Sequence, residues 1–176
     1  MFKRFLSKVL RGIVFPIIPA MMIALFVNTF VTEAFIMEQG PSMQPNLFVG
    51  DRVMTEKVSY RFREPMRGDI VVVERGVQGV DLVKRVIGLP GEVVEVRSGH
   101  VWINGELQLE PYAQNFGGPD YGPALIPIGQ VFVLGDNRRI SHDSRIMGPV
   151  SLEAIQRRVL FVYWPLEWGQ VFPLKY

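Results

Sequence analysis

Four segments of the sequence combine turn residues with side chains that can take part in chemistry: residues 40–47 (GPSMQPNL), residues 50–53 with 67–71, residues 81–92, and residues 135–145 (GDNRRISHDSR). Serine, lysine and histidine can each act as a nucleophile or as a general base. Taken alone, each segment also has an ordinary interpretation. Ser42 precedes a proline-containing turn, Lys84 could protect an edge strand from aggregation, and the last segment could be a solvated turn. The chemistry therefore depends on how the segments occur together.

In this order, the four segments resemble the conserved boxes of the bacterial type I signal peptidases, also called leader peptidases. The shared patterns are S-M-x-P-x-L, K-R-V-I-G-L-P-G and G-D-N-R-x-x-S-x-D-S-R, and the resemblance covers most of residues 30–148. It implies a membrane-bound serine endopeptidase that cleaves N-terminal signal peptides from exported precursor proteins after a small-x-small motif. It identifies Ser42 as the nucleophile and Lys84 as the general base, and it implies neither a metal nor a cofactor.

Pairing a serine with a lysine makes a physical demand on the fold. A serine hydroxyl is a weak nucleophile and needs an adjacent base to take its proton. A lysine with the ordinary pKa of about 10.4 is neutral in only roughly one molecule in 2,500 at pH 7. Burial lowers the pKa, and a catalytic lysine is expected near 7–8. The local residues that could bury Lys84 are Leu82, Val83, Val86 and Ile87.

The resemblance assigns a supporting role to five residues of the last segment: Gly135, Asp136, Ser141, Asp143 and Arg145. On this pattern the Ser141 hydroxyl hydrogen-bonds the Lys84 amine and orients it, while Asp143 pairs with Arg145. A carboxylate placed directly against Lys84 would raise its pKa, so both aspartates are expected to be structural. Two positions depart from the family pattern. Gly40 replaces a serine that helps to stabilise the oxyanion in some members, and Asn46 replaces a threonine.

His142 beside Asp143 suggests a competing Ser-His-Asp triad with Ser42. Adjacent residues on a strand face opposite ways, whereas a triad needs the aspartate and the histidine to face each other. Related peptidases that use histidine carry it at the position of Lys84. The dyad is therefore the favoured interpretation.

Selectivity for alanine at two alternating substrate positions suits an extended peptide laid along an edge strand, with alternate side chains in shallow apolar pockets. By their position, the candidates for the pocket walls are Ile36, Met43, Leu47, Leu82 and Val83. Glu38 occupies a similar position, but a carboxylate is unusual in such a wall, and the alternative is that it faces water.

The elements that must position these residues are predicted to be strands. Short β-branched runs cover residues 69–73, 82–87, 92–96, 100–103 and 130–134. Ser98-Gly99 and Asn104-Gly105 are typical two-residue hairpin turns. The short spacings leave no room for crossover helices, so the fold class is mostly β, an antiparallel sheet or open β-barrel. Residues 111–129 are expected to form a surface loop and residues 151–158 a short helix.

The chain begins with a predicted transmembrane helix. Residues 12–32 are 21 consecutive uncharged residues, and about 1.5 Å per residue gives roughly 30 Å of helix, enough to cross a bilayer. Residues 1–11 hold four basic groups, so the positive-inside rule places them in the cytoplasm and residues 33–176 outside the cytoplasmic membrane. A cleavable signal peptide is the alternative. The aromatic stretch 161–165, together with Trp168, could rest on the lipid surface or form a last strand.

Composition excludes several other classes of protein. The 176 residues include no cysteine and only two histidines, which argues against thiol chemistry and cysteine- or histidine-rich metal sites. Of the 19 basic residues, four lie in residues 1–11, which leaves 15 against 17 acidic residues in the rest of the chain. The body therefore lacks the excess of basic residues expected of a nucleic-acid binder.

The expected partners are signal-peptide-bearing preproteins and the lipid bilayer. Two other functions stay open at this point: a specialised Ser/Lys peptidase devoted to one exported substrate, such as a conjugation pilin, and a non-catalytic membrane-anchored β binding module. Gly40, which departs from the family pattern, is the feature that supports the binding module.

Overall fold

A computed structural model of the chain describes residues 12, 15–38, 40–74 and 79–165. Its helical elements are α2 (Phe15–Phe30), η2 (Ser59–Arg61), α3 (Ser144–Met147) and η4 (Leu152–Ala154). Its strands are β1 (Thr32–Ile36), β2 (Arg52–Glu56), β3 (Ile70–Val73), β4 (Leu82–Gly88), β5 (Val93–Arg97), β6 (His100–Ile103), β7 (Glu106–Leu107), β8 (Tyr121–Leu125), β9 (Gln130–Leu134), β10 (Val150–Ser151) and β11 (Ile155–Trp164).

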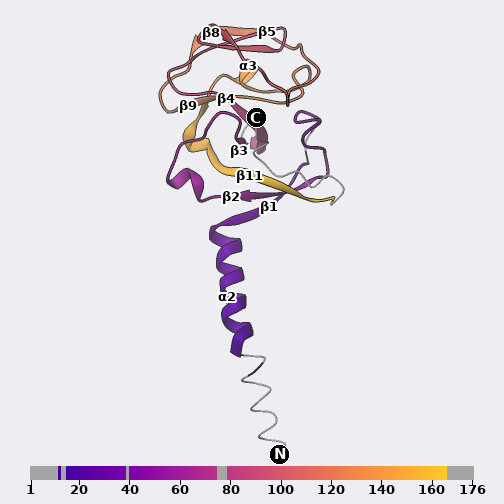
Figure 1. The fold of residues 1–176 in the computed structure, drawn as a ribbon, viewed down its shortest axis with the longest axis vertical. Helices are drawn as coiled ribbons and strands as arrows, with labels where there is room; N and C mark the ends of the chain where they lie inside the picture. Colours follow the sequence, from indigo (N-terminus) through magenta and orange to yellow (C-terminus); the bar gives the residue numbers. More distant parts are fainter. Residues whose placement is uncertain (1–11, 13–14, 39, 75–78, 166–176) are drawn as a thin grey trace, which may run out of the picture.

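Two antiparallel sheets make up the body of the protein (Figure 1). The larger has seven strands in the order β1-β2-β11-β3-β4-β9-β10, and the smaller has four in the order β7-β6-β5-β8. All the pairings within these two sheets are antiparallel. The predicted fold class, a mostly β protein built on an antiparallel sheet, is therefore confirmed.

Strand β4 is the central element for the candidate site. All seven of its residues are buried, including the charged pair Lys84 and Arg85. Successive side chains of a strand point to opposite faces, so these two neighbours project to different sides of the sheet. The apolar residues of β3 and β4 are divided among three buried clusters that together form the core. This packing fixes the backbone from which Lys84 projects.

The two hairpin turns predicted from the sequence are confirmed in the small sheet. Ser98 and Gly99 have φ of 50° and 83°, and Asn104 and Gly105 have φ of 51° and 86°. Positive φ at both central residues is the type I′ pattern, which matches the twist of the flanking strands. These turns connect β5 to β6 and β6 to β7.

Two sequence predictions are wrong. Residues 111–129 are not entirely loop, because β8 pairs with β5 at the edge of the small sheet. Gly122 and Pro123 interrupt its apolar pattern, and an edge strand tolerates proline where a central strand does not. Residues 151–158 do not form one helix: Ser151 caps the short η4, and the chain then enters β11, the longest strand described.

Helix α2 spans 16 residues, and most of its large apolar side chains are exposed. Within the described ranges, no helix is both long and apolar enough to cross a membrane. Strand β1 begins at Thr32, the last residue of the predicted span of residues 12–32. The predicted cytoplasmic segment, residues 1–11, lies outside the described residues, as does Trp168. The aromatic stretch 161–165 contributes to the end of β11, where Trp164 is half exposed.

Candidate active site

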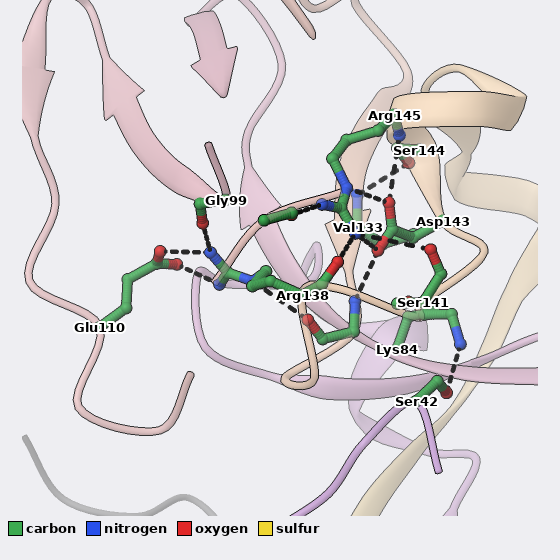
Figure 2. A network of polar contacts seen from close by, with 12 residues as sticks. Ser42, Lys84, Gly99, Glu110, Val133, Arg138, Ser141, Asp143, Ser144 and Arg145 are labelled. Carbon is green, nitrogen blue, oxygen red and sulfur yellow. Dashed lines mark hydrogen bonds and ion pairs between the residues drawn. The ribbon is translucent and has the colours of Figure 1, made fainter. Parts of the chain in front are cut away.

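The structure brings Ser42 and Lys84 into contact although 42 residues separate them in the chain. Lys84 Nζ donates hydrogen bonds to Ser42 Oγ at 2.8 Å and to the Val83 carbonyl at 3.1 Å. Figure 2 shows the Lys84 side chain extending from β4 toward Ser42, which lies in the turn after β1. At this distance a proton can pass directly from the hydroxyl to a neutral amine.

The surroundings of Lys84 favour that neutral amine. The side chain is only 3% exposed, and burial lowers the pKa of Lys84 from 10.5 to about 8. Asp143 and Asp136 act in the opposite direction, but more weakly than burial. At pH 7 an amine with a pKa of about 8 is neutral in roughly one molecule in eleven, over 200 times more often than an unperturbed lysine. The sheet therefore supplies a usable base near neutral pH.

The segment around Ser42 is held by two asparagines. The backbone N–H of Asn137 donates to the Ser42 carbonyl at 3.0 Å, and its side-chain amide donates to the Pro41 carbonyl at 3.2 Å. Asn46 Nδ2 donates to Asp136 Oδ2 at 2.8 Å and to the Tyr112 carbonyl at 2.9 Å. These contacts hold residues 41–46, which we call the nucleophile loop because they contain the candidate nucleophile Ser42, against residues 135–145. We did not predict them from the sequence.

Asp136 is bound by Arg85 rather than by Lys84. The Arg85 guanidinium donates two hydrogen bonds to the carboxylate, at 2.8 and 2.7 Å, and a third to the Gly68 carbonyl at 3.0 Å. Both side chains are 1% exposed. A fork-to-fork pair of this kind is strong and directional. This geometry agrees with the structural role predicted for Asp136. Arg85 was not predicted as a site residue, although a second charged residue directly after Lys84 in an apolar strand could have identified it.

Asp143 makes the ion pair that the family resemblance implied. Its two carboxylate oxygens accept from Arg145 Nε at 2.8 Å and from Arg145 Nη2 at 2.9 Å. The carboxylate also accepts from the Gly135 N–H at 3.1 Å and caps α3 through the Arg145 N–H. Arg145 in turn donates to the Arg138 and Gly117 carbonyls at 2.6 and 2.9 Å. Both side chains are fully buried. Figure 2 shows the pair, and through the Gly135 N–H it joins the end of β9 to the start of α3.

A third buried pair anchors the same segment to the small sheet. Arg138 donates to the Glu110 carboxylate at 2.6 and 2.7 Å and to the Gly99 carbonyl at 2.8 Å. It also donates to the Gly135 carbonyl at 3.1 Å. Glu110 lies in a part of the sequence that we expected to be near a surface loop, so this pair was missed.

Gly135 is required for space. A Cβ at this position would lie 2.2 Å from Ser141 Oγ and 2.5 Å from the Ser42 carbonyl oxygen. Even alanine would therefore separate the nucleophile loop from β9. The absence of a side chain lets three backbone segments meet at the candidate site.

The hydrogen bond expected between Ser141 and Lys84 is not present. The Ser141 hydroxyl is buried, but it has no hydrogen-bond partner among the described residues. The reason is that the Lys84 amine is directed at Ser42 Oγ and the Val83 carbonyl instead. Ser141 packs beside Gly135, where its side chain fills the space left by the missing Cβ.

The geometry does not support the competing triad. His142 is exposed, whereas the neighbouring Asp143 is fully buried, and both oxygens of Asp143 accept from Arg145. The described contacts include no hydrogen bond between His142 and Asp143. The carboxylate is therefore not placed to orient the imidazole, as a triad requires.

A cleft of about 440 Å³ opens beside Ser42 and Lys84. Of the predicted pocket residues, Ile36, Leu82 and Val83 line it, together with Glu38 and His142. The cleft thus contains both Ser42 and Lys84 and has partly apolar walls. Its size and position suit a short stretch of extended polypeptide.

Met43 and Leu47, the other two predicted pocket residues, are not among the residues that line this cleft. They are 0% and 1% exposed and belong to a core cluster with Val53 and Ile70. The chain turns immediately after Ser42, and the N–H groups of Asn46 and Leu47 both donate to the Met43 carbonyl at 3.0 Å. This turn directs both apolar side chains inward.

The fold and the site together define the class: a β-sheet hydrolase with a serine and a buried lysine in hydrogen-bond contact at a peptide-sized cleft. Comparison with known proteins agrees. The model of the family "Signal peptidase, peptidase S26" matches residues 10–164. The chain therefore belongs to the signal peptidase family, whose members are serine endopeptidases that cleave signal peptides, and this is its activity. The signal peptidase I family is membrane-associated in general.

Individual relatives are similar over most of the chain. A probable signal peptidase I-2 from a Synechocystis species is 39% identical over 155 residues, which are 85% of this chain and 71% of that protein. Signal peptidase I from Leptolyngbya laminosa is 41% identical over 157 residues, 84% of this chain and 76% of that protein. A crystal structure of a signal peptidase I from Enterococcus faecalis V583 is 36% identical with a TM-score of 0.47, and the match covers 56% of this chain and 97% of that one.

Proposed function

We propose that Ser42 is the nucleophile and Lys84 the general base of this signal peptidase. The observation that carries the proposal is the 2.8 Å contact between Lys84 Nζ and Ser42 Oγ, made by an amine whose pKa burial lowers to about 8. The neutral amine takes the hydroxyl proton as Oγ attacks the scissile carbonyl carbon. The resulting ammonium then protonates the departing amine nitrogen, which leaves an ester between the signal peptide and Ser42.

The same pair completes the reaction with water. Lys84, neutral again after the mature protein leaves, accepts a proton from a water molecule that attacks the ester carbonyl. Collapse of the second tetrahedral intermediate breaks the bond to Ser42 Oγ, and the proton returns to the serine. The signal peptide is released as a carboxylate, and the enzyme is regenerated.

The oxyanion of each tetrahedral intermediate needs a hydrogen-bond donor, a contribution often worth about 3–4 kcal/mol. The backbone N–H of Ser42 makes no hydrogen bond with the described residues, and we assign it this role. Gly40 lines the same cleft with φ +54° and open space where a side chain would be. Because Gly40 has no hydroxyl, the hydrogen bonds to the oxyanion come from backbone N–H groups and from water.

The substrates are preproteins cut after a small-x-small sequence, with Ile36, Leu82 and Val83 forming the pocket walls. Leu82 and Val83 are 9% and 5% exposed, so only shallow depressions are open to a substrate side chain. Shallow apolar pockets accept alanine and exclude bulky residues. This explains a preference for small side chains without any specific polar contact.

Residues 12–32 are proposed to anchor the chain in the cytoplasmic membrane as a single pass, with residues 1–11 in the cytoplasm and residues 33–176 outside. The support is the uncharged run of 21 residues, the basic groups before it, and the exposed apolar side chains of α2. Protease added to the outer face of spheroplasts should digest residues 33–176 but leave a tag fused before Met1 intact. Digestion of the tag instead would show that the chain has the opposite orientation in the membrane.

One experiment tests the chemistry. The full chain in detergent, with Ser42→Ala, Lys84→Ala and His142→Ala variants, is incubated with a panel of preproteins. Loss of cleavage in the first two variants and its retention in the third supports the dyad, whereas the opposite pattern for Lys84 and His142 supports the triad. Cleavage of a single preprotein would indicate a specialised peptidase, and cleavage of none a binding module.

A further inference from the structure

One wall of the cleft carries a carboxylate among apolar side chains. Along β1 and the residues that follow it, side chains alternate between the core and the cleft. Residues 34–38 all contribute to the lining of the cleft, but their exposure alternates: Ala34, Ile36 and Glu38 are exposed, whereas Phe35 packs against the core and Met37 is buried in it. The alternation continues past the end of β1 because Met37 exchanges backbone hydrogen bonds with the Gly50–Asp51 segment. Glu38 therefore faces the same space as the apolar wall.

No group of the described chain compensates this carboxylate. Glu38 makes no ion pair or side-chain hydrogen bond with any described residue. The other acid of the cleft, Asp81, is held by Arg157, and the Lys84 amine is directed at Ser42. Glu38 is thus the cleft carboxylate left available to a bound peptide.

We propose that Glu38 is a specificity-determining residue that favours preproteins with a lysine or arginine close to the cleavage site. The proposal rests on the proposed function, because it takes this cleft as the path of the substrate. Glu38 precedes Ser42 by four residues, so at most about 3.3–3.6 Å per residue the two lie within roughly 14 Å. A substrate position that faces Glu38 is therefore within about four residues of the scissile bond.

The same geometry limits the preference to one position. In an extended peptide, alternate side chains face the same wall, and neighbouring residues point away from it. Only one substrate side chain at a time can then lie against the carboxylate. Because the cleft is open to solvent at Glu38, an ion pair between Glu38 and a substrate lysine or arginine should behave as a surface ion pair. This corresponds to a gain in kcat/KM of roughly two- to fivefold over an uncharged residue. A glutamate at that position should lose a similar factor.

The test is a charge scan of a single preprotein with an alanine-rich cleavage region. Lysine, alanine and glutamate are placed in turn at each position from four before to four after the scissile bond, and kcat/KM is measured for each. With the unmodified enzyme we expect one position at which lysine exceeds glutamate by about tenfold, with a smaller ratio at high salt. Glu38→Gln should abolish the preference there, and Glu38→Lys should invert it.

Glu106→Gln is the matched control, since it makes the same change of net charge on exposed β7, away from the cleft. It should leave the profile unchanged. A flat profile with the unmodified enzyme, or a preference that survives Glu38→Gln, would overturn the inference. Cleavage of the all-alanine preprotein by the unmodified enzyme and by Glu106→Gln, and its loss in Ser42→Ala, separates this outcome from failure of the proposed function.

Discussion

Burial of the Lys84 amine, the proposed general base, should lower the stability of the folded protein. Its pKa falls from 10.5 to about 8 because burial disfavours the charged amine. A shift of about 2.5 units corresponds to about 3 kcal/mol of lost folding free energy below pH 8. Lys84→Met replaces the amine with an apolar side chain of similar length. The hydrogen bond to Ser42, which contributes about 1 kcal/mol, is lost in the variant, so we expect a net stabilisation of about 2 kcal/mol at pH 7.

The dependence on pH distinguishes this mechanism from better packing. Between pH 8 and 10.5 the unfolded chain holds a proton on Lys84 that the folded protein has released, so the stability of the unmodified protein rises with pH in this window. Below pH 8 both states are protonated and the destabilisation is complete. Above pH 10.5 both are neutral and it disappears. The advantage of Lys84→Met should therefore be constant from pH 6 to 7.5 and shrink steadily above pH 8.

Urea denaturation of the full chain in detergent, followed by tryptophan fluorescence at half-unit steps from pH 6 to 10, measures this difference. Ser42→Ala is the control, because it removes the same hydrogen bond but retains the amine. Contributions from other titrating groups cancel when the two proteins are compared at one pH. A Lys84→Met variant that is no more stable than the parent at pH 7, or whose advantage does not change up to pH 10, would refute the account of the buried amine.

Three further predictions follow from the site. The rate of cleavage, measured as kcat/KM, should rise tenfold per pH unit up to about pH 8 and then level off, as the neutral form of Lys84 accumulates; a rate that falls over this range would contradict its role as base. Asp136→Asn leaves the Arg85 guanidinium buried without its counter-charge and should cost about 3 kcal/mol in urea denaturation, and a loss below 1 kcal/mol would show that the pair is not structurally important. Gly135→Ala should lower kcat at least tenfold while circular dichroism still shows a β fold, because its Cβ would displace the Ser42 carbonyl; full activity would show that the loop relaxes freely.

The strands that the sequence predicts best are those with continuous β-branched runs. Residues 82–87 and 130–134 match β4 and β9 almost residue for residue, because these strands are buried and burial produces the apolar runs seen in the sequence. Strand β8 was missed because Gly122 and Pro123 are tolerated only through its position at a sheet edge, which the sequence does not reveal. The first half of β11 was missed for a related reason: Ser151 is a true cap, but the helix it begins ends after one turn.

The candidate site, like the strands, was predicted only in part from the sequence. The resemblance to signal peptidases brought Ser42 and Lys84 together across 42 residues, a contact that neither composition nor periodicity could supply. It could not show that the turn after Ser42 buries Met43, because pocket and core residues are both apolar and differ only in the direction of the side chain. Nor could it show that the Ser141 hydroxyl lacks a partner among the described residues, since that depends on where the lysine amine points.

Two buried arginines, Arg85 and Arg145, show how carboxylates can lie near Lys84, the proposed general base, without contacting its amine. Asp136 and Asp143 both raise the pKa of Lys84, but each is bonded through both of its oxygens to an arginine. Burial is nevertheless the larger effect, and the pKa of Lys84 falls to about 8. The two ion pairs direct both carboxylates at guanidinium groups, while the Lys84 amine donates to Ser42 Oγ and to the Val83 carbonyl. The segment around Ser42 thus gains rigid polar support without a hydrogen bond between a carboxylate and the amine, which would raise the pKa of Lys84 further.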